Sequence, residues 1–133
     1  MTNFEIGKGY KVRKGTDITF ICSGPILAEA FKVAQMVKES VMIMDMPTIR
    51  PVDAALIEEA AKVTGRICTV HDHFENGGLK EEVLQVIASR RLRVQFDWIA
   101  LSGFAESGSQ ADLYDKYGLS ARRIIEKLKL TPR

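Results

Sequence analysis

The residues best suited to chemistry in this chain lie in one short segment. The apolar run 67–70 ends abruptly in polar side chains and two glycines, which are His71, Asp72, His73, Glu75, Asn76, Gly77 and Gly78. The two histidines of this segment are the only ones in the chain. Open α/β sheets place ligand or partner contacts where a strand stops in a loop that leads into a helix. This segment is therefore the candidate functional loop.

A metal site is the first chemistry that the loop suggests. In an extended segment His71 and His73 point to the same side, and Asp72 or Glu75 could add an oxygen ligand. A catalytic zinc site needs three protein ligands, and the sequence supplies no third histidine or ligating cysteine. We therefore expect no metal site, and we favour a polar loop that hydrogen-bonds across an interface.

An anion site is the second possibility, because Gly77 and Gly78 open a helix whose N-terminus would attract negative charge. The chain contains neither a Gly-x-Gly-x-x-Gly motif nor a phosphate-loop lysine motif. Glycines at such a turn also serve tight backbone geometry, including positive φ angles. The pairs Ser23-Gly24 and Ser102-Gly103 end their strands similarly and could line the same sheet edge. A small-molecule or nucleotide site at this edge stays open as an alternative.

Nucleophilic and acid–base catalysis find no support in the sequence. There is no Gly-x-Ser-x-Gly elbow. The acidic pairs Glu58-Glu59 and Glu81-Glu82 fall on expected helices, where adjacent residues do not face each other, so we expect solvated faces there. Arg50 precedes a proline in a rigid turn, and we expect it to form a structural ion pair. The residue chemistry alone indicates a non-catalytic α/β domain.

The length and composition fit one soluble globular domain covering residues 1–133. A chain of 133 residues can bury one core, and 46% apolar with 27% charged residues is ordinary. A net charge of +2 without a basic stripe argues against nucleic acid, and no apolar stretch approaches the roughly 18 residues of a membrane helix. Cys22 and Cys68 lie in separate apolar runs, so we expect buried free thiols and a cytoplasmic location.

The pattern along the chain alternates strands and helices. After an extended lead-in at residues 1–13, apolar runs predict strands over 17–22, 41–46, 66–70 and 94–101. Helical spacing predicts helices over 27–37, from an N-cap at Asp53 to a stop at Gly65, and over 79–87. A Gly/Ser loop at 102–109 and two short helices follow, one over 110–117 and one after Ser120. This order implies a mostly parallel sheet with helices on both faces.

Five segments, in this order, resemble the C-terminal domain of transketolase and its relatives. They are Lys14-Gly-Thr-Asp-Ile-Thr-Phe-Ile-Cys-Ser-Gly24, Pro47-Thr-Ile-Arg-Pro-Val-Asp53, Cys68-Thr-Val-His-Asp-His-Phe-Glu-Asn-Gly-Gly78, Ser102-Gly-Phe-Ala-Glu-Ser-Gly-Ser109 and Tyr117-Gly-Leu119. The last two are closer to transketolase than to deoxyxylulose-phosphate synthase or the beta subunits of 2-oxoacid dehydrogenases. His71 stands where the family usually has Glu.

The resemblance implies a three-layer α/β/α fold with a mostly parallel five-stranded sheet in which one strand is antiparallel. It also implies a parent enzyme of the pentose phosphate pathway, a part of carbohydrate metabolism, that moves a two-carbon ketol unit between sugar phosphates. That enzyme uses thiamine diphosphate and Mg²⁺ (or Ca²⁺), held by two other domains. This chain has no Gly-Asp-Gly with a downstream asparagine to hold metal and diphosphate.

We therefore expect the C-terminal domain of a transketolase, inactive alone and serving domain packing and dimer assembly. It is expected to contribute no catalytic, cofactor-binding or metal-binding residue. Its expected partners are the remaining transketolase domains or a separate subunit, and a second copy in a homodimer. Two alternatives remain open: the same domain of a deoxyxylulose-phosphate synthase or 2-oxoacid dehydrogenase beta subunit, and a stand-alone small-molecule-binding α/β module.

Overall fold

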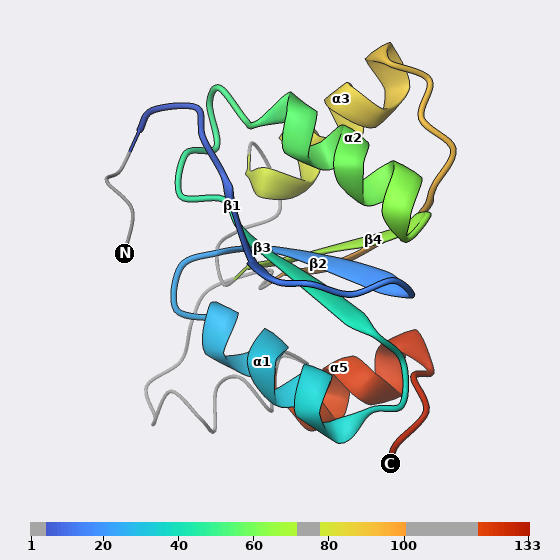
Figure 1. Ribbon diagram of the computed structural model, residues 1–133. Helices are drawn as coiled ribbons and strands as arrows, with labels where there is room; N and C mark the ends of the chain where they lie inside the picture. The colour runs from blue at the N-terminus through green and yellow to red at the C-terminus, as the bar shows by residue number, and fades with distance from the viewer. Residues whose placement is uncertain (1–4, 72–77, 101–119) are drawn as a thin grey trace.

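A five-stranded sheet forms the middle layer of the protein, between two layers of helices (Figure 1). The computed structural model describes residues 5–71, 78–100 and 120–133. The strands are β1 (Tyr10–Arg13), β2 (Ile18–Ser23), β3 (Val41–Asp45), β4 (Arg66–His71) and β5 (Gln95–Ala100), arranged in the order β1-β3-β2-β4-β5. β1 runs antiparallel to β3, and every other pair is parallel. The expected three-layer fold with one antiparallel strand is confirmed.

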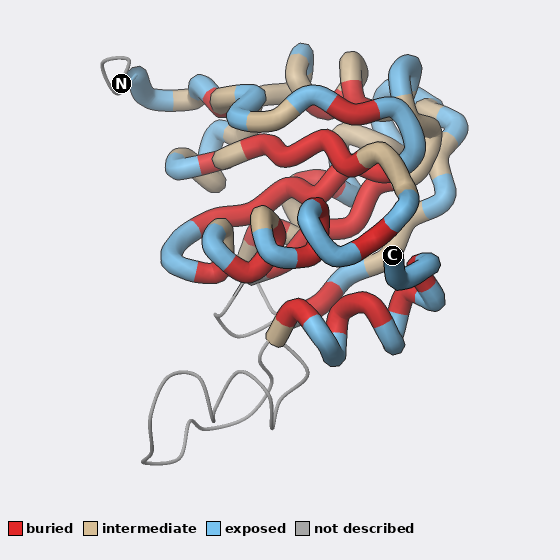
Figure 2. Tube along the Cα trace, turned by 60° about the horizontal axis from the view of Figure 1, so that its bottom comes forward, coloured by how far each residue is buried: buried red, intermediate tan, exposed pale blue. Residues whose placement is uncertain are grey.

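β2 is the central strand, and all six of its residues are buried. Its mostly apolar sequence suits a strand that is covered on both faces (Figure 2). Ile18, Phe20 and Cys22 belong to the core on one side of the sheet, and Ile21 belongs to the core on the other. The sheet thus separates two apolar cores.

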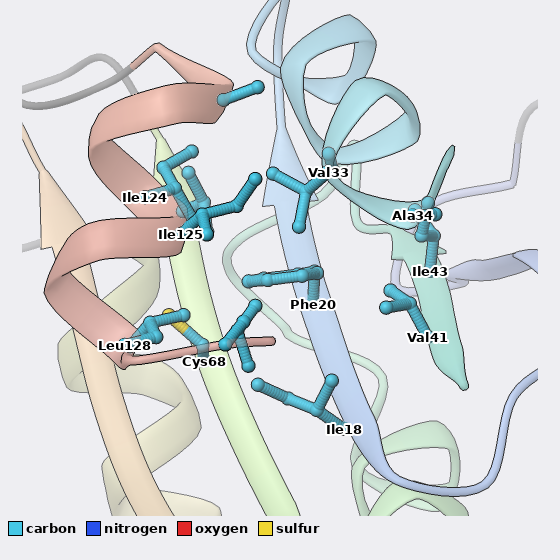
Figure 3. Packing of buried hydrophobic residues seen from close by; sticks show 14 of the residues in the cluster. Ile18, Phe20, Val33, Ala34, Val41, Ile43, Cys68, Ile124, Ile125 and Leu128 are labelled. Atoms are coloured by element: carbon cyan, nitrogen blue, oxygen red, sulfur yellow. The ribbon is translucent and has the colours of Figure 1, made fainter. Parts of the chain in front are cut away.

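The described helices cover both faces of the sheet (Figure 1). α1 (Leu27–Met36) and α5 (Ala121–Leu128) lie on one face, where Val33, Ile124 and Ile125 pack with Phe20 and Cys68 (Figure 3). α2 (Ala54–Val63) and α3 (Leu79–Ser89) lie on the other. Within the described residues, no helix combines the length and apolar character needed to cross a bilayer.

The helix ends follow the capping pattern that the sequence predicts. Asp53 Oδ1 accepts a hydrogen bond from Leu56 N at 3.2 Å at the start of α2. Gly65 follows α2 with a φ of 67°, which favours glycine. Ser120 is the N-cap of α5. The expected loop at 102–109 and the expected helix at 110–117 lie outside the described residues.

The lead-in at residues 1–13 contains the edge strand β1, which the sequence did not resolve. It is tied to α2, because Gly9 N donates to Asp53 Oδ2 at 2.9 Å and Lys11 forms an ion pair with Glu59. β1 also has a register irregularity between Lys11 and Arg13. A charged, irregular edge strand discourages pairing with another chain.

The acidic pairs on α2 and α3 differ from the expectation of plain solvated faces. All four carboxylates are half-buried and ion-paired, and three of them pair with another segment because these helices face one another, β1 and the loop after β3. The pairs are Glu58 with Arg90 at 2.9 Å, Glu59 with Lys11, Glu81 with Lys80 at 3.4 Å and Glu82 with Arg50 at 3.2 Å. The solvated-face expectation is wrong, and the structural ion pair expected of Arg50 is confirmed.

Candidate functional site: the switch point of the sheet

The candidate loop begins at the topological switch point of the sheet. From β2 the chain passes to β3 on one side, and it then returns to β4 on the other side of β2. Ligand crevices in open α/β sheets form outside the carboxyl ends of the strands at such a reversal. Ser23 and His71, the last residues of β2 and β4, are register partners there. The strand that ends here, β4, is the one that the sequence predicted to precede the candidate loop.

The structure describes only part of the predicted site. It gives the backbone of His71 at the end of β4, where Ser23 and Ala100 flank it in register, and it gives Gly78 as the N-cap of α3. The remaining candidates lie outside the described residues, namely Asp72, His73, Glu75, Asn76 and Gly77, together with Ser102 and Gly103.

The N-terminus of α3 is occupied by the helix's own carboxylates. Gly78 N donates a hydrogen bond to Glu81 Oε2 at 3.3 Å, and Glu82 also lies in the first turn. Negative charge at this position satisfies the positive end of the helix dipole and competes with a bound anion. Gly78 has a φ of −105°, so its backbone does not use the conformational freedom of glycine.

A carboxylate also lies at the start of α1, but its hydrogen bond goes to another helix. The chain turns through Gly24, whose φ is 92°, and Glu29 lies in the first helical turn. Glu29 Oε1 accepts a hydrogen bond from Ala121 N at 2.9 Å, and Oε2 forms an ion pair with Lys32 at 2.8 Å. One buried carboxylate thus lies in the first turn of α1 and caps the N-terminus of α5.

Every described helix therefore has a carboxylate at its positive end: Glu29 for α1 and α5, Asp53 for α2, and Glu81 with Glu82 for α3. A diphosphate or sugar phosphate placed there would face like charge. The described residues also contain no group of three His, Cys, Asp or Glu side chains that could hold a metal ion. This part of the chain does not fit a thiamine diphosphate–metal site.

The two thiols are structural. Cys22 and Cys68 are both free and buried, as expected. Burial, followed by the charge of Asp45, raises the pKa of Cys22 far above its ordinary value. Burial also raises the pKa of Cys68, with a smaller contribution from Asp97. A thiol that stays protonated is a poor nucleophile.

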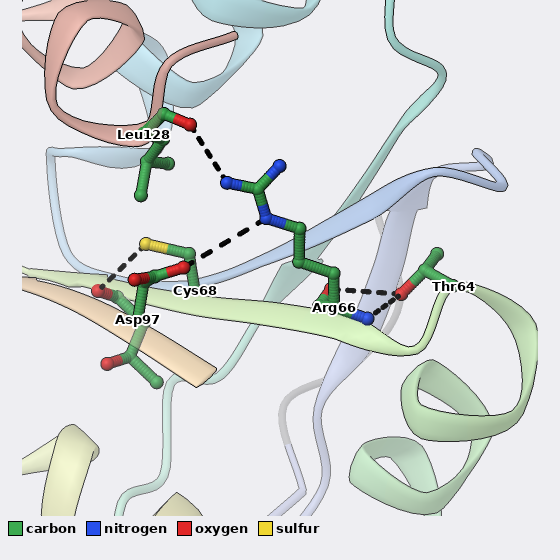
Figure 4. Close-up of polar contacts among 6 residues, drawn as sticks. Thr64, Arg66, Cys68, Asp97 and Leu128 are labelled. Carbon is green, nitrogen blue, oxygen red and sulfur yellow. Dashed lines mark hydrogen bonds and ion pairs between the residues drawn. The ribbon is translucent and has the colours of Figure 1, made fainter. Parts of the chain in front are cut away.

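Arg66 and Asp97 form a polar link that the sequence reasoning missed. Arg66 Nη2 donates to the carbonyl of Leu128 at 2.9 Å, and its Nε lies 4.0 Å from Asp97 Oδ2 (Figure 4). Arg66 therefore joins β4 to β5 and to the C-terminus of α5. The sequence feature that could have revealed this link is the opposite charge of Arg66 and Asp97, which stand in two otherwise apolar strand segments.

The fold and the switch-point loop define a doubly wound α/β domain whose described helix N-termini are filled by its own carboxylates. The family model of the transketolase C-terminal domain matches residues 7–124. The chain belongs to the transketolase C-terminal domain family.

Similar proteins agree with this family. The chain is 39% identical to human transketolase-like protein 2 over 97% of its own length and 21% of that protein. It is 37% identical to the putative transketolase C-terminal section of Methanocaldococcus jannaschii, over 95% of this chain and 42% of that one. A solved structure described as a split gene transketolase, inactive beta4 tetramer, superposes with a TM-score of 0.87 at 27% identity, covering 96% of this chain and 43% of that one. The chain thus spans about a fifth of human transketolase-like protein 2, and less than half of the Methanocaldococcus jannaschii protein and of the chain in the solved structure.

Proposed function

We propose that this chain is the C-terminal part of a transketolase-type enzyme and acts through assembly, without catalytic activity of its own. The observation that carries the proposal is coverage: 97% of this chain matches only 21% of human transketolase-like protein 2. In the proposed parent enzyme, the activity is transfer of a two-carbon ketol unit between sugar phosphates in the cytoplasmic pentose phosphate pathway. Thiamine diphosphate and Mg²⁺ (or Ca²⁺) belong to the remaining parts.

The chemistry of the described residues supports a non-catalytic role for this chain. The helix N-termini that other α/β domains offer to phosphate are occupied here by Glu29, Asp53 and Glu81. The two buried thiols have raised pKa values. These features fit a rigid scaffold that positions other domains better than they fit a catalytic centre.

The loop from His71 to Gly78 is the proposed contact with the remaining transketolase domains. It starts at the switch point beside Ser23, where loops of α/β sheets reach outward. Its polar groups are suited to hydrogen bonds across a domain boundary. Placed there, the loop would position the neighbouring domain without binding a metal itself.

Association with a second copy is the other part of the proposal. The solved relative is described as a beta4 tetramer, so copies of that section assemble with one another. We propose that this chain likewise forms homodimers or larger assemblies.

Reconstitution tests the proposed function. The isolated chain should show no ketol transfer between sugar phosphates, and calorimetry should detect no binding of thiamine diphosphate with Mg²⁺. Adding the polypeptide that carries the two cofactor domains should produce activity that depends on both components. Micromolar binding of thiamine diphosphate by the isolated chain would contradict the proposal, as would full activity of the cofactor domains without this chain.

A further inference from the structure

The only tryptophan of the chain lies at the edge of the sheet with much of its surface in solvent. Trp98 is in β5, and its side chain is 42% exposed. Among the described strands, β5 pairs with β4 alone. Phe96, two residues earlier on the same face, stacks with Trp98 at a centroid distance of 6.3 Å. β5 therefore presents two aromatic rings side by side.

Helix α3 extends this aromatic surface. Lys80 Nζ lies 4.5 Å from the centroid of the Trp98 ring, which is cation–π geometry. Leu84 is one turn further along α3 and 37% exposed. Residues four apart on a helix share one face, so Leu84 lies beside Lys80 on the surface of α3. We call Lys80, Leu84, Phe96 and Trp98 the Trp98 strip.

The other large exposed apolar side chains of the described residues are scattered. They lie on the lead-in, on β1 and at the ends of α1 and α2, and they are Ile6, Val12, Met36 and Val63. In the Trp98 strip, by contrast, two exposed apolar side chains flank the same residue: Trp98 stacks under Lys80, and Leu84 lies beside Lys80 on α3. A grouped apolar surface of this kind marks an interaction site.

The charge of the strip permits contact between two copies. Its one ionic side chain, Lys80, is only 15% exposed, and its ammonium lies 3.4 Å from Glu81 Oε1. The lysine charge is thus compensated within the same chain. Two such strips can face one another without the repulsion that two uncompensated lysines would create.

We propose that the Trp98 strip is an interface between two copies of this chain, in a two-fold arrangement where each strip contacts the other. The inference rests on the self-association in the proposed function and assigns a surface to it. A two-fold interface brings the same patch of both copies together, so Trp98 of one copy meets the strip of the second. The strip is small compared with a standard interface of about 800 Å² per partner, so the association is weak and depends on concentration.

Trp98 reports on its own contact. Its fluorescence is measured from low-micromolar to near-millimolar chain, with sedimentation velocity on the same samples. Burial of the indole should shift the emission to shorter wavelength over the concentration range in which the sedimentation coefficient rises. Strictly monomeric sedimentation at the highest concentration overturns the proposal, and so does association without an emission shift.

Two substitutions and a matched control test the surface. Trp98→Ala and Leu84→Glu should each weaken self-association more than about tenfold, as loss of a central interface residue does. Val63→Glu places the same charge on α2 at an apolar residue of similar exposure, 44% against 37%, and should leave association unchanged. Circular dichroism establishes that all three variants are folded. Equal effects of Leu84→Glu and Val63→Glu overturn the assignment.

The outcomes separate this inference from the proposed function. If Leu84→Glu supports full reconstituted ketol transfer and associates as the wild type does, the strip assignment fails while the assembly role stands. If Trp98 emission shifts only when the cofactor-domain polypeptide is added, the strip binds that polypeptide and the two-copy proposal is wrong. If reconstitution fails while the strip variants still weaken association, the proposed function fails alone.

Discussion

Glu29 Oε1 in helix α1 accepts a hydrogen bond from the backbone N of Ala121, the first residue of helix α5, at 2.9 Å. The two residues are 92 positions apart, and both are buried. Ala121 N is one of the N–H groups that a helix leaves without an internal partner. A side chain from a distant helix thus caps α5 and fixes it beside α1 on the same face of the sheet.

Replacement of Glu29 should show how much this cap contributes. Glu29→Ala removes the acceptor from a buried N–H and should lower the free energy of unfolding by about 1.5–3 kcal/mol. Glu29→Gln keeps an acceptor oxygen and should cost less. Glu126→Ala removes a carboxylate from the exposed face of α5 and should cost under about 0.5 kcal/mol. Urea denaturation of the three variants gives the comparison, and equal losses for Ala and Gln would show that the hydrogen bond is not the cause.

Two buried threonines on the same face of the sheet offer a matched test of hydrogen bonding. Thr19 Oγ1 lies 2.8 Å from Thr64 Oγ1, whereas the buried Thr69 hydroxyl has no hydrogen-bond partner among the described residues. Valine has the same shape and suits a strand. Thr19→Val should therefore lose about 0.5–1.5 kcal/mol, while Thr69→Val should be neutral or stabilising. Thermal unfolding followed by calorimetry ranks the two variants, and a lower melting temperature for Thr69→Val than for Thr19→Val would contradict the argument.

The order of elements could be predicted from the sequence because each buried strand and amphipathic helix carries its own local pattern. The six buried residues of β2 read as a central strand, and Asp53 and Gly65 marked the ends of α2. β1 could not be assigned in the same way. Only its end residues, Tyr10 and Arg13, are half-buried, so no alternation of apolar and polar residues reveals the strand.

The position of the candidate loop could be predicted, but its surroundings could not. The polar residues after Val70 mark the end of a strand. That this end is the switch point depends on the spatial order of strands, which periodicity does not specify. Likewise, no local pattern around Glu29 indicates that its hydrogen-bond partner is Ala121, which lies 92 positions away. The Trp98 strip depends on the alternation of side chains in β5 and on the placement of α3 above it.

Gly15 and Gly65 should respond to substitution for different reasons. A Cβ on Gly15 would lie 2.2 Å from the carbonyl carbon of Val41 and 2.3 Å from Met42 N, so the backbone itself must move. Gly15→Ala should cost about 3 kcal/mol or more. A Cβ on Gly65 meets nothing closer than 3.9 Å, and only its φ of 67° opposes a side chain, which should cost about 1–2 kcal/mol.

Asparagine separates the two causes, because it tolerates the left-handed conformation. Gly65→Asn should recover part of the loss seen with Gly65→Ala, and Gly15→Asn should recover none. Guanidinium denaturation midpoints of the four variants provide the measurement. If Gly15→Asn were more stable than Gly15→Ala, the close approach to Val41 would not be the cause of the loss.

The proposed interface role of the loop at 71–78 predicts a difference between the isolated chain and the reconstituted enzyme. Since the proposal has this segment facing a neighbouring domain and not the core, replacing His71 and His73 together with Ala should change the stability of the isolated chain by less than about 0.5 kcal/mol, the usual limit for surface substitutions. The same change should weaken assembly or activity when the cofactor domains are present. Melting temperatures with and without zinc complete the test: a zinc-dependent rise that disappears in the double variant would establish a metal site instead.

Asp45, at the end of β3, should make stability depend on pH. Desolvation by burial raises the pKa of Asp45 above its ordinary value of 3.8, so the folded state holds this proton more tightly than the unfolded chain does. Below pH 3.8 the carboxyl is protonated in both states and costs nothing. As the pH rises through the folded pKa, ionisation of the half-buried group destabilises the fold.

The variant Asp45→Asn removes this charge and keeps the shape of the side chain. Its melting temperature should exceed that of the wild type at pH 7, and the two should converge as the pH falls below about 3.8. Glu126→Gln, on the exposed face of α5 where the carboxylate pairs with Arg122 and Arg123, is the control for a change in net charge alone. Melting curves between pH 3 and pH 7 give the difference in melting temperature between each variant and the wild type at each pH. An advantage of Asp45→Asn that persists unchanged at pH 3 would show that its cause is packing and not the buried charge.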